Sequence, residues 1–395
     1  MNKLIPVYLI CLALGCLGQV RGQAVLPVAG KTYRIAVFAP LYLDSAFNKS
    51  TQARYGNTLP KFIIPAVEFM QGARIAFDTI PVGDRQVQAF MYDTRSTLQP
   101  VSWLIRYHQL DSMDLIIGSV KDPDYHELAD FALEHNIPFV SATYPNDGGV
   151  LANPDLIIVN PTLRTNCEGI FSYILQKHGT DKIYLVERKG EDRIENYFRN
   201  INYADGKPLL TIHPILVDST ISTYSLMNRI DTARSCVIIG ATLDEDFAKN
   251  LADACYPIQK KHPLVLIGMP NWDGFRSLYQ KNAYKDFPIR FTTPHFDGSG
   301  GPCDSILVKQ YFKLYRARPS DMAFKGFEVA WYFTNLLLAH PTDFMQHLND
   351  TTFEAFHEFN FRPVYVGQQN STPDYFENKH LFVMEILNGD IVREW

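Results

Sequence analysis

Three apolar runs that lie close together constrain the fold more than any other feature of this chain. They cover residues 113–118 (MDLIIG), 137–141 (IPFVS) and 156–160 (LIIVN), and each has the length and composition of a short buried strand. The first and third runs lead directly into helical patterns. Buried strands that alternate with helices form parallel sheets, so the sequence predicts an α/β protein with doubly wound parallel sheets.

The alternation continues along almost the whole chain. Strands are expected over residues 33–40, 87–92, 113–118, 137–141, 156–160, 182–187, 209–216, 236–240, 264–268, 290–293, 363–366 and 381–387. Helices are expected over residues 66–79, 100–110, 123–136, 166–177, 192–203, 223–231, 243–255, 271–280, 304–315 and 323–339. Asp122 is expected to cap the third of these helices, with Pro123 as its first residue.

The first 22 residues have the features of an export signal and are excluded from the fold. A short cationic start precedes an apolar stretch over residues 4–15, which is too short to span a bilayer. Small residues precede Gln23, so cleavage is expected before it, and a periplasmic location follows. Cys16 after Gly15 leaves a lipid anchor open as the alternative. The mature chain has no apolar run that could cross a membrane.

Size and charge narrow the class of protein further. Residues 23–395 are too many for one ordinary core and indicate two domains. The formal net charge is −5, and no basic run or basic face stands out. Nucleic acid is therefore not expected as a partner.

Four cysteines follow the signal segment, namely Cys167, Cys236, Cys255 and Cys303. None lies at the close spacing of a zinc motif, so no metal site is expected. Export permits disulfides, yet the apolar setting of these cysteines favours buried free thiols. Cys236–Cys255 is the one pairing that stays open.

Sequence motifs that are typical of common enzyme families are missing. There is no GxGxxG after the first strand, no P-loop, no HExxH and no GxSxG. No catalytic residue and no cofactor is expected, and the interpretation is a non-enzymatic protein.

At this point the chain resembles the type I periplasmic binding proteins, the family of branched-chain amino-acid receptors. The resemblance is carried by residues 35–41 (IAVFAPL), 69–78 (FMQGARIAFD), 115–141, 182–186 with 191–198, and 290–297 (RFTTPHFD) followed by 313–331. It implies two doubly wound parallel-sheet lobes joined by a three-segment hinge, with ligand bound between them. Carried over, lobe I would hold residues 23–159 and 296–360, and lobe II residues 160–295 and 361–395. The crossings would fall near 159–161, 293–296 and 361–366.

Candidate ligand-binding residues lie where predicted strands end, because parallel sheets bind ligands outside the carboxyl ends of their strands. The resemblance matches Ser141, Ala142 and Thr143 to contacts for an α-amino acid. The other candidates are Tyr42, Ser119, Lys121, Asp122, Asn160, Thr162, Thr242, Asp244, Trp272 and Phe296. Asp122 departs from the family pattern, in which a hydroxyl residue at the helix start faces the ligand carboxylate. An ionised cap would repel a carboxylate, so either Lys121 offsets its charge or Asp122 binds an amine or a sugar hydroxyl instead.

The expected function is an exported solute-binding protein that captures a small polar, amino-acid-like ligand, as in the family, for an ABC permease. The alternative is a cell-envelope protein-interaction module of the same fold with no transport role. An enzyme is the third and least favoured interpretation.

Overall fold

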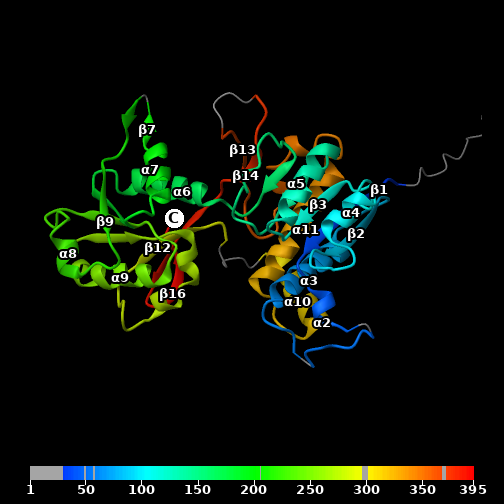
Figure 1. Cartoon of the computed structure of the whole chain (residues 1–395), viewed down its shortest axis with the longest axis horizontal. Coiled ribbons are helices and arrows are strands. Elements are labelled where there is room, and N and C mark those ends of the chain that lie inside the picture. The colour runs from blue at the N-terminus through cyan, green and yellow to red at the C-terminus, as the bar shows by residue number, and fades with distance from the viewer. Residues whose placement is uncertain (1–29, 49, 57, 205, 296–300, 367–370) are drawn as a thin grey trace, which may run out of the picture.

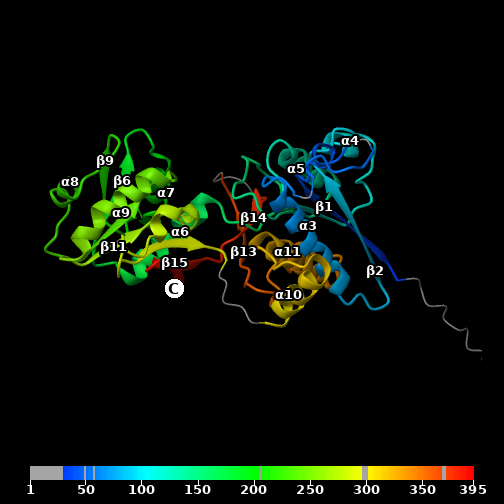
Figure 2. The same ribbon diagram turned by 90° about the horizontal axis from the view of Figure 1, so that it is seen from below.

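The computed structural model describes residues 30–395 apart from 49, 57, 205, 296–300 and 367–370. Figure 1 shows two bodies side by side, joined near the middle of the molecule, and Figure 2 shows the same separation from below. The expected signal segment, Cys16 and Phe296 lie outside the described residues. No helix within the described part of the chain has both the length and the apolarity needed to cross a bilayer.

The first body, which we call lobe I, is built on a seven-stranded sheet in the order β13-β14-β5-β4-β3-β1-β2. All neighbouring strands are parallel except β13 and β14. The strands are β1 (Thr32–Ala39), β2 (Gln86–Asp93), β3 (Leu115–Gly118), β4 (Phe139–Ser141), β5 (Leu156–Ile158), β13 (Phe361–Val364) and β14 (Tyr375–Asn378). The helices are α2 (Leu43–Ala46), α3 (Ile64–Thr79), α4 (Val101–Arg106), α5 (Asp124–His135), α10 (Pro302–Tyr315) and α11 (Asp321–Ala339), with 3₁₀ turns η3 (Phe344–Gln346) and η4 (Thr351–Phe353).

The second body, lobe II, has a seven-stranded sheet in the order β16-β15-β12-β11-β10-β6-β9, antiparallel only at β12–β15 and β15–β16. Its strands are β6 (Lys182–Arg188), β9 (Ile212–Val217), β10 (Cys236–Gly240), β11 (Leu264–Ile267), β12 (Ile289–Thr293), β15 (Phe382–Leu387) and β16 (Asp390–Arg393). Its helices are α6 (Leu163–Lys177), α7 (Arg193–Ile201), α8 (Thr223–Met227) and α9 (Glu245–Gln259). A small ribbon of β7 (Tyr203–Ala204) and β8 (Lys207–Pro208) follows α7, and η1 (Pro270–Gly274) and η2 (Arg276–Tyr279) replace the expected helix over 271–280.

Both sheets repeat one topology. The first five strands of lobe I have the order β2-β1-β3-β4-β5, and the matching strands of lobe II have the order β9-β6-β10-β11-β12. The order reverses between β1 and β3 in lobe I, and between β6 and β10 in lobe II. This is the doubly wound arrangement that the sequence predicted, and ligands bind at the reversal point of such sheets.

Burial on both faces explains why the central strands read as continuous apolar runs. Ile35 and Val37 of β1 point into a core shared with α3 and α11. Ala36 and Phe38 point into a second core on the opposite face, shared with α4 and α5. Strands covered by helices on both sides carry apolar residues at every position instead of at every second one.

The helices α3 and α11 approach each other unusually closely because glycines lie at their contact. A Cβ atom on Gly326 would lie 2.0 Å from the carbonyl oxygen of Phe69, and one on Gly72 would lie 1.9 Å from that of Ala323. These distances are far below van der Waals contact. Only glycine at both positions permits this backbone approach.

The chain passes between the lobes three times, between Ile158 and Leu163, between Thr293 and Pro302, and between Asn378 and Phe382. The third crossing differs from the expectation near 361–366, which assigned the whole tail to lobe II. Phe376 of β14 pairs with Ile157 of β5, so residues 361–378 complete the sheet of lobe I. The sequence of β14, YFEN, is too polar and too short to be recognised as a strand that joins a parallel sheet.

Candidate ligand-binding site

The carboxyl ends of both sheets face the crossing segments. The chain leaves lobe I directly after Ile158, where β5 ends, and leaves lobe II directly after Thr293, where β12 ends. Because the central strands of each sheet are parallel, their carboxyl ends lie along the same edge. The reversal points of the two sheets therefore lie on the sides of the lobes to which the crossings attach.

Lobe I brings three of the predicted residues together at this edge. The hydroxyls of Ser119 and Thr143 lie 3.1 Å apart, and the side-chain amide of Asn160 donates to the Thr143 carbonyl at 3.1 Å. Ser141 is fully buried, and its Oγ has no hydrogen-bond partner among the described residues. Ala142 is also buried and donates its N–H to the Gly118 carbonyl, so it contributes backbone alone.

Tyr42 follows β1 in a left-handed backbone conformation with φ of 53°. The Asp93 carboxylate at the end of β2 holds this loop, because its Oδ1 accepts from the N–H groups of Leu41 at 2.8 Å and Tyr42 at 3.1 Å. The half-buried Tyr42 ring packs edge-on against Phe62. Asp93 thus has a structural role in this loop.

Asp122 does not cap α5, which corrects the expectation. The N-cap is Pro123, with no side-chain cap, and the helix begins at Asp124. The exposed Asp122 carboxylate instead accepts from the Tyr144 hydroxyl at 3.1 Å and lies 3.3 Å from the His126 ring. Pro123 itself occupies the cap position, with φ of −83° and ψ of −14°, so Asp122 lies one residue before the cap. Lys121 is exposed beside it.

Lobe II presents an ion pair at its reversal point, and sequence reasoning identified only half of it. Arg188, the last residue of β6, donates from Nη2 to Asp244 Oδ1 at 2.8 Å. Asp244 also caps α9 by accepting from the Phe247 N–H at 2.8 Å. That bond and Arg188 lower the pKa of Asp244, which keeps it ionised. The place of Arg188 at a strand tip was the signal available for finding it.

Three other predicted residues have structural roles. Trp272 is fully buried in the lobe II core and donates from Nε1 to the Thr242 carbonyl at 3.0 Å, so the expectation that it stacks on a ligand is wrong. Thr242 is buried as well, and its hydroxyl accepts from the Asp244 N–H. Thr162 caps α6 by accepting from the Thr165 N–H at 3.4 Å.

A polar network joins the first and third crossings. The buried Glu377 of β14 accepts from the Thr162 N–H at 2.7 Å and from Lys379 Nζ at 2.9 Å. Lys379 also contacts Thr165 and Glu168 on α6 of lobe II. The network connects β14, the last strand of lobe I, to α6, the first helix of lobe II, at two of the segments that join the lobes.

Glu187 precedes Arg188 and is almost fully buried. Burial, followed by repulsion from Glu195, raises the pKa of Glu187 to about 7. A carboxyl group whose folded-state pKa is raised contributes stability below its unfolded value and loses it as the pH rises through the folded value. The loss falls between about pH 4.5 and pH 7.

We therefore expect Glu187→Gln to raise the free energy of unfolding at pH 8 by about 2 kcal/mol, because the neutral amide never has to ionise. Near pH 5 the gain should disappear. Denaturant titrations at both pH values measure this, with the exposed Glu191→Gln as the matched control. An equal effect of Glu187→Gln at pH 5 and pH 8 contradicts the assignment.

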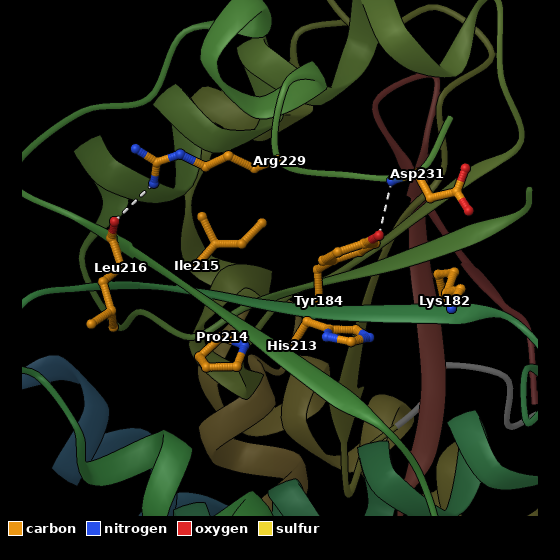
Figure 3. A pocket seen from close by; sticks show the side chains of 8 residues that line it. All are labelled: Lys182, Tyr184, His213, Pro214, Ile215, Leu216, Arg229 and Asp231. Atoms are coloured by element: carbon orange, nitrogen blue, oxygen red, sulfur yellow. Dashed lines mark hydrogen bonds between the residues drawn. The ribbon is translucent and has the colours of Figure 1, made fainter. Parts of the chain in front are cut away.

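Two cavities lie away from this edge. One of about 520 Å³ runs along the outer strand β9, and Figure 3 shows Arg229 donating to the Leu216 carbonyl and the Asp231 N–H donating to the Tyr184 hydroxyl at its rim. The other, of about 810 Å³, runs along the outer strand β2 of lobe I. Both are open grooves beside sheet edges, and neither contains a predicted ligand-binding residue.

The four described cysteines are free thiols. Cys167, Cys236 and Cys255 are buried and Cys303 is half-buried. Burial raises the pKa of each, which makes them poor nucleophiles at neutral pH.

No protein-family model and no curated protein matches the chain. Solved structures do match it. A putative branched-chain amino-acid ABC transporter protein from Rhodospirillum rubrum is 12% identical, with a TM-score of 0.62 over 92% of this chain and all of that one. An ABC transporter substrate-binding protein from Desulfitobacterium hafniense, solved in complex with Leu, is also 12% identical, with a TM-score of 0.56 over the same shares. A leucine-binding protein from Thermotoga maritima is 14% identical, with a TM-score of 0.51 over 92% of this chain and 98% of that one.

These likenesses extend over both lobes and agree with the paired doubly wound sheets described above. The chain therefore has the fold of the type I periplasmic binding proteins.

Proposed function

We propose that this chain is a non-enzymatic solute-binding protein that captures a small, amino-acid-like ligand between its lobes. In this proposal it acts outside the cytoplasmic membrane and delivers the ligand to an ABC permease. The observation that carries the proposal is the polar chemistry at the reversal point of each sheet. Lobe I offers the hydroxyls of Ser119 and Thr143, and lobe II offers the ion pair of Arg188 and Asp244.

This set of groups suits a zwitterion. A guanidinium binds a carboxylate through paired N–H donors, and a carboxylate binds an ammonium group. Arg188 and Asp244 form an ion pair with each other. A ligand that carries both charges replaces one internal ion pair by two, and the hydroxyls of lobe I supply donors or acceptors as the ligand requires.

The correction at Asp122 removes an objection to such a ligand. An ionised cap on α5 would have occupied the free N–H groups of the helix and repelled a carboxylate. The Asp122 carboxylate lies instead on Tyr144 and His126. The first turn of α5 therefore has no side-chain cap from this residue.

The test is a thermal-shift screen of the purified protein against amino acids, sugars and short peptides. A ligand at a hundred times its Kd stabilises the folded state by about 2.7 kcal/mol, so we expect the melting temperature to rise by about 5 °C with the right amino acid. Arg188→Gln should abolish this shift. Lys189→Gln, which changes the adjacent exposed cation bound to Asp218, should preserve it.

Two outcomes count against the proposal. A flat response to the whole library favours the protein-interaction alternative. A shift that both variants retain equally means that the ligand binds away from Arg188.

A further inference from the structure

A second cluster of polar side chains lies where the second crossing meets lobe I. It consists of His295 in the crossing segment, Glu328 on α11 and His357 shortly before β13. One potential metal-ligating atom from each of the three residues lies within 4.8 Å of the other two. Figure 2 shows α11 and β13 on the side of lobe I from which the chain passes to lobe II.

The three donors are a set that zinc uses. Two imidazoles and one carboxylate are the protein ligands of many open zinc sites, in which a fourth position takes water or another ligand. At zinc–ligand distances of about 2.0–2.2 Å, neighbouring donors of a tetrahedral site lie roughly 3.4 Å apart. A separation of up to 4.8 Å therefore needs side-chain movements of about an ångström and no change of backbone.

The cluster is already partly organised. Glu328 is 1% exposed, and its Oε1 accepts from the His357 backbone N–H at 3.0 Å and lies 2.9 Å from the His357 Nδ1. The rings of His295 and His357 lie edge to face with centroids 5.3 Å apart. Two of the three proposed ligands, Glu328 and His357, are thus already in contact.

An independent observation at His295 also points to a ligand. Its Nε2 is shielded from solvent and has no hydrogen-bond partner among the described residues. A buried polar nitrogen without a partner costs free energy on folding, which a bound ligand would recover. Nothing described so far gives this nitrogen a function.

One neighbouring charge opposes a cation. Lys325, which is 8% exposed, lies one helical turn before Glu328 and is close enough to His295 to affect it electrostatically. The partly buried His380 of the third crossing also lies near His357. The carboxylate of Glu328 offsets one of these positive charges, so the affinity expected is lower than that of a fully anionic site.

A second group, His340, Asp343 and His347 at the end of α11, is the natural comparison. Its two rings are stacked 3.7 Å apart and almost parallel, so the lone pairs of their nitrogens run side by side instead of converging. His347 already pairs with Asp343 at 2.9 Å, and His340 pairs with Asp350 at 3.1 Å. Both histidines of this group are thus already paired with carboxylates, and the group serves as the internal control.

We propose that His295, Glu328 and His357 form a binding site for a divalent transition metal of the zinc type, which links the second crossing to lobe I. The site is independent of the solute-binding proposal and uses none of its residues. Sequence spacing gave no sign of it, because the three ligands come from segments that only the fold brings together.

The first experiment titrates the metal-free full protein with Zn²⁺ alone and measures binding by calorimetry. The second titrates it with Co²⁺ and measures the visible absorption spectrum. We expect one Zn²⁺ per chain and visible ligand-field bands for Co²⁺. His295→Gln should weaken Zn²⁺ binding by at least 10–100-fold, roughly the cost of losing even a supporting group at a metal site. His347→Gln should leave both signals unchanged.

Melting of each variant without metal separates a lost ligand from a lost fold. His295→Gln should melt close to the temperature of the parent protein, since the ring atom Nε2 has no hydrogen-bond partner among the described residues that the substitution could remove. Glu328→Gln offers a second variant should His295→Gln fold poorly. Absence of Zn²⁺ binding, or binding that depends on His347 and not on His295, overturns the proposal.

Discussion

Gly326→Ala is expected to destabilise lobe I by about 3 kcal/mol, although alanine is the better helix former by about 1 kcal/mol. The reason is the close contact of α3 and α11. A Cβ atom at position 326 would lie 2.0 Å from the Phe69 carbonyl oxygen, which is backbone and has no rotamer to change. The two helices would have to separate, and the core that they share with the sheet would open.

A helical glycine in lobe II provides the matched control. A Cβ atom on Gly169 of α6 would lie 2.7 Å from Leu381 Cδ1, the end of a flexible side chain. Gly169→Ala should therefore change the free energy of unfolding by less than about 1 kcal/mol. Urea denaturation followed by circular dichroism measures both variants. If Gly326→Ala is as stable as the parent protein, the helices do not pack as described.

Trp272→Ala is expected to cost about 3–5 kcal/mol, which is the usual cost of deleting a buried tryptophan. The indole packs directly over Gly240 and Gly268, and Cβ atoms at these positions would lie 2.6 Å and 2.0 Å from its ring. Neither glycine has a side chain that could fill the space left by the ring. The bond from Nε1 to the Thr242 carbonyl would also be lost, leaving a buried acceptor.

The same substitution distinguishes a core residue from a ligand contact. A tryptophan that stacked on a solute at the surface would cost little stability when truncated and much affinity. Calorimetric melting of Trp272→Ala, compared with the exposed Trp395→Ala, decides between them. A loss below about 1 kcal/mol at Trp272 would restore the ligand-stacking interpretation.

The architecture was predictable because it follows from local patterns. The burial of strands such as residues 115–118 on both faces makes them continuously apolar, and the helices between them carry one apolar face. The position of three polar residues of lobe I at one edge of the sheet was predictable for the same reason. Ser119, Thr143 and Asn160 follow strands that are adjacent in sequence as well as in the sheet.

The features that the sequence did not predict correctly, or did not predict at all, depend on contacts between distant segments. Trp272 lies in η1, shortly after β11, and only the packing of the lobe II core determines that it points inward. The polar β14 is a strand because β5 lies beside it, not because of its own composition. The group of His295, Glu328 and His357 likewise exists only once the crossing segment meets α11.

The interleaving of the two lobes has a consequence for how the protein is made. During synthesis, the sheet of lobe I still lacks β13 and β14 after most of lobe II has been translated. Lobe II in turn needs β15 and β16, which follow β14 in the sequence. Lobe I can complete its sheet only after most of lobe II has been translated, and lobe II is completed last. A premature stop codon just after Lys379 would leave the strand set of lobe I whole, while exposing the unpaired edge of β12 in its neighbour as a surface prone to aggregation.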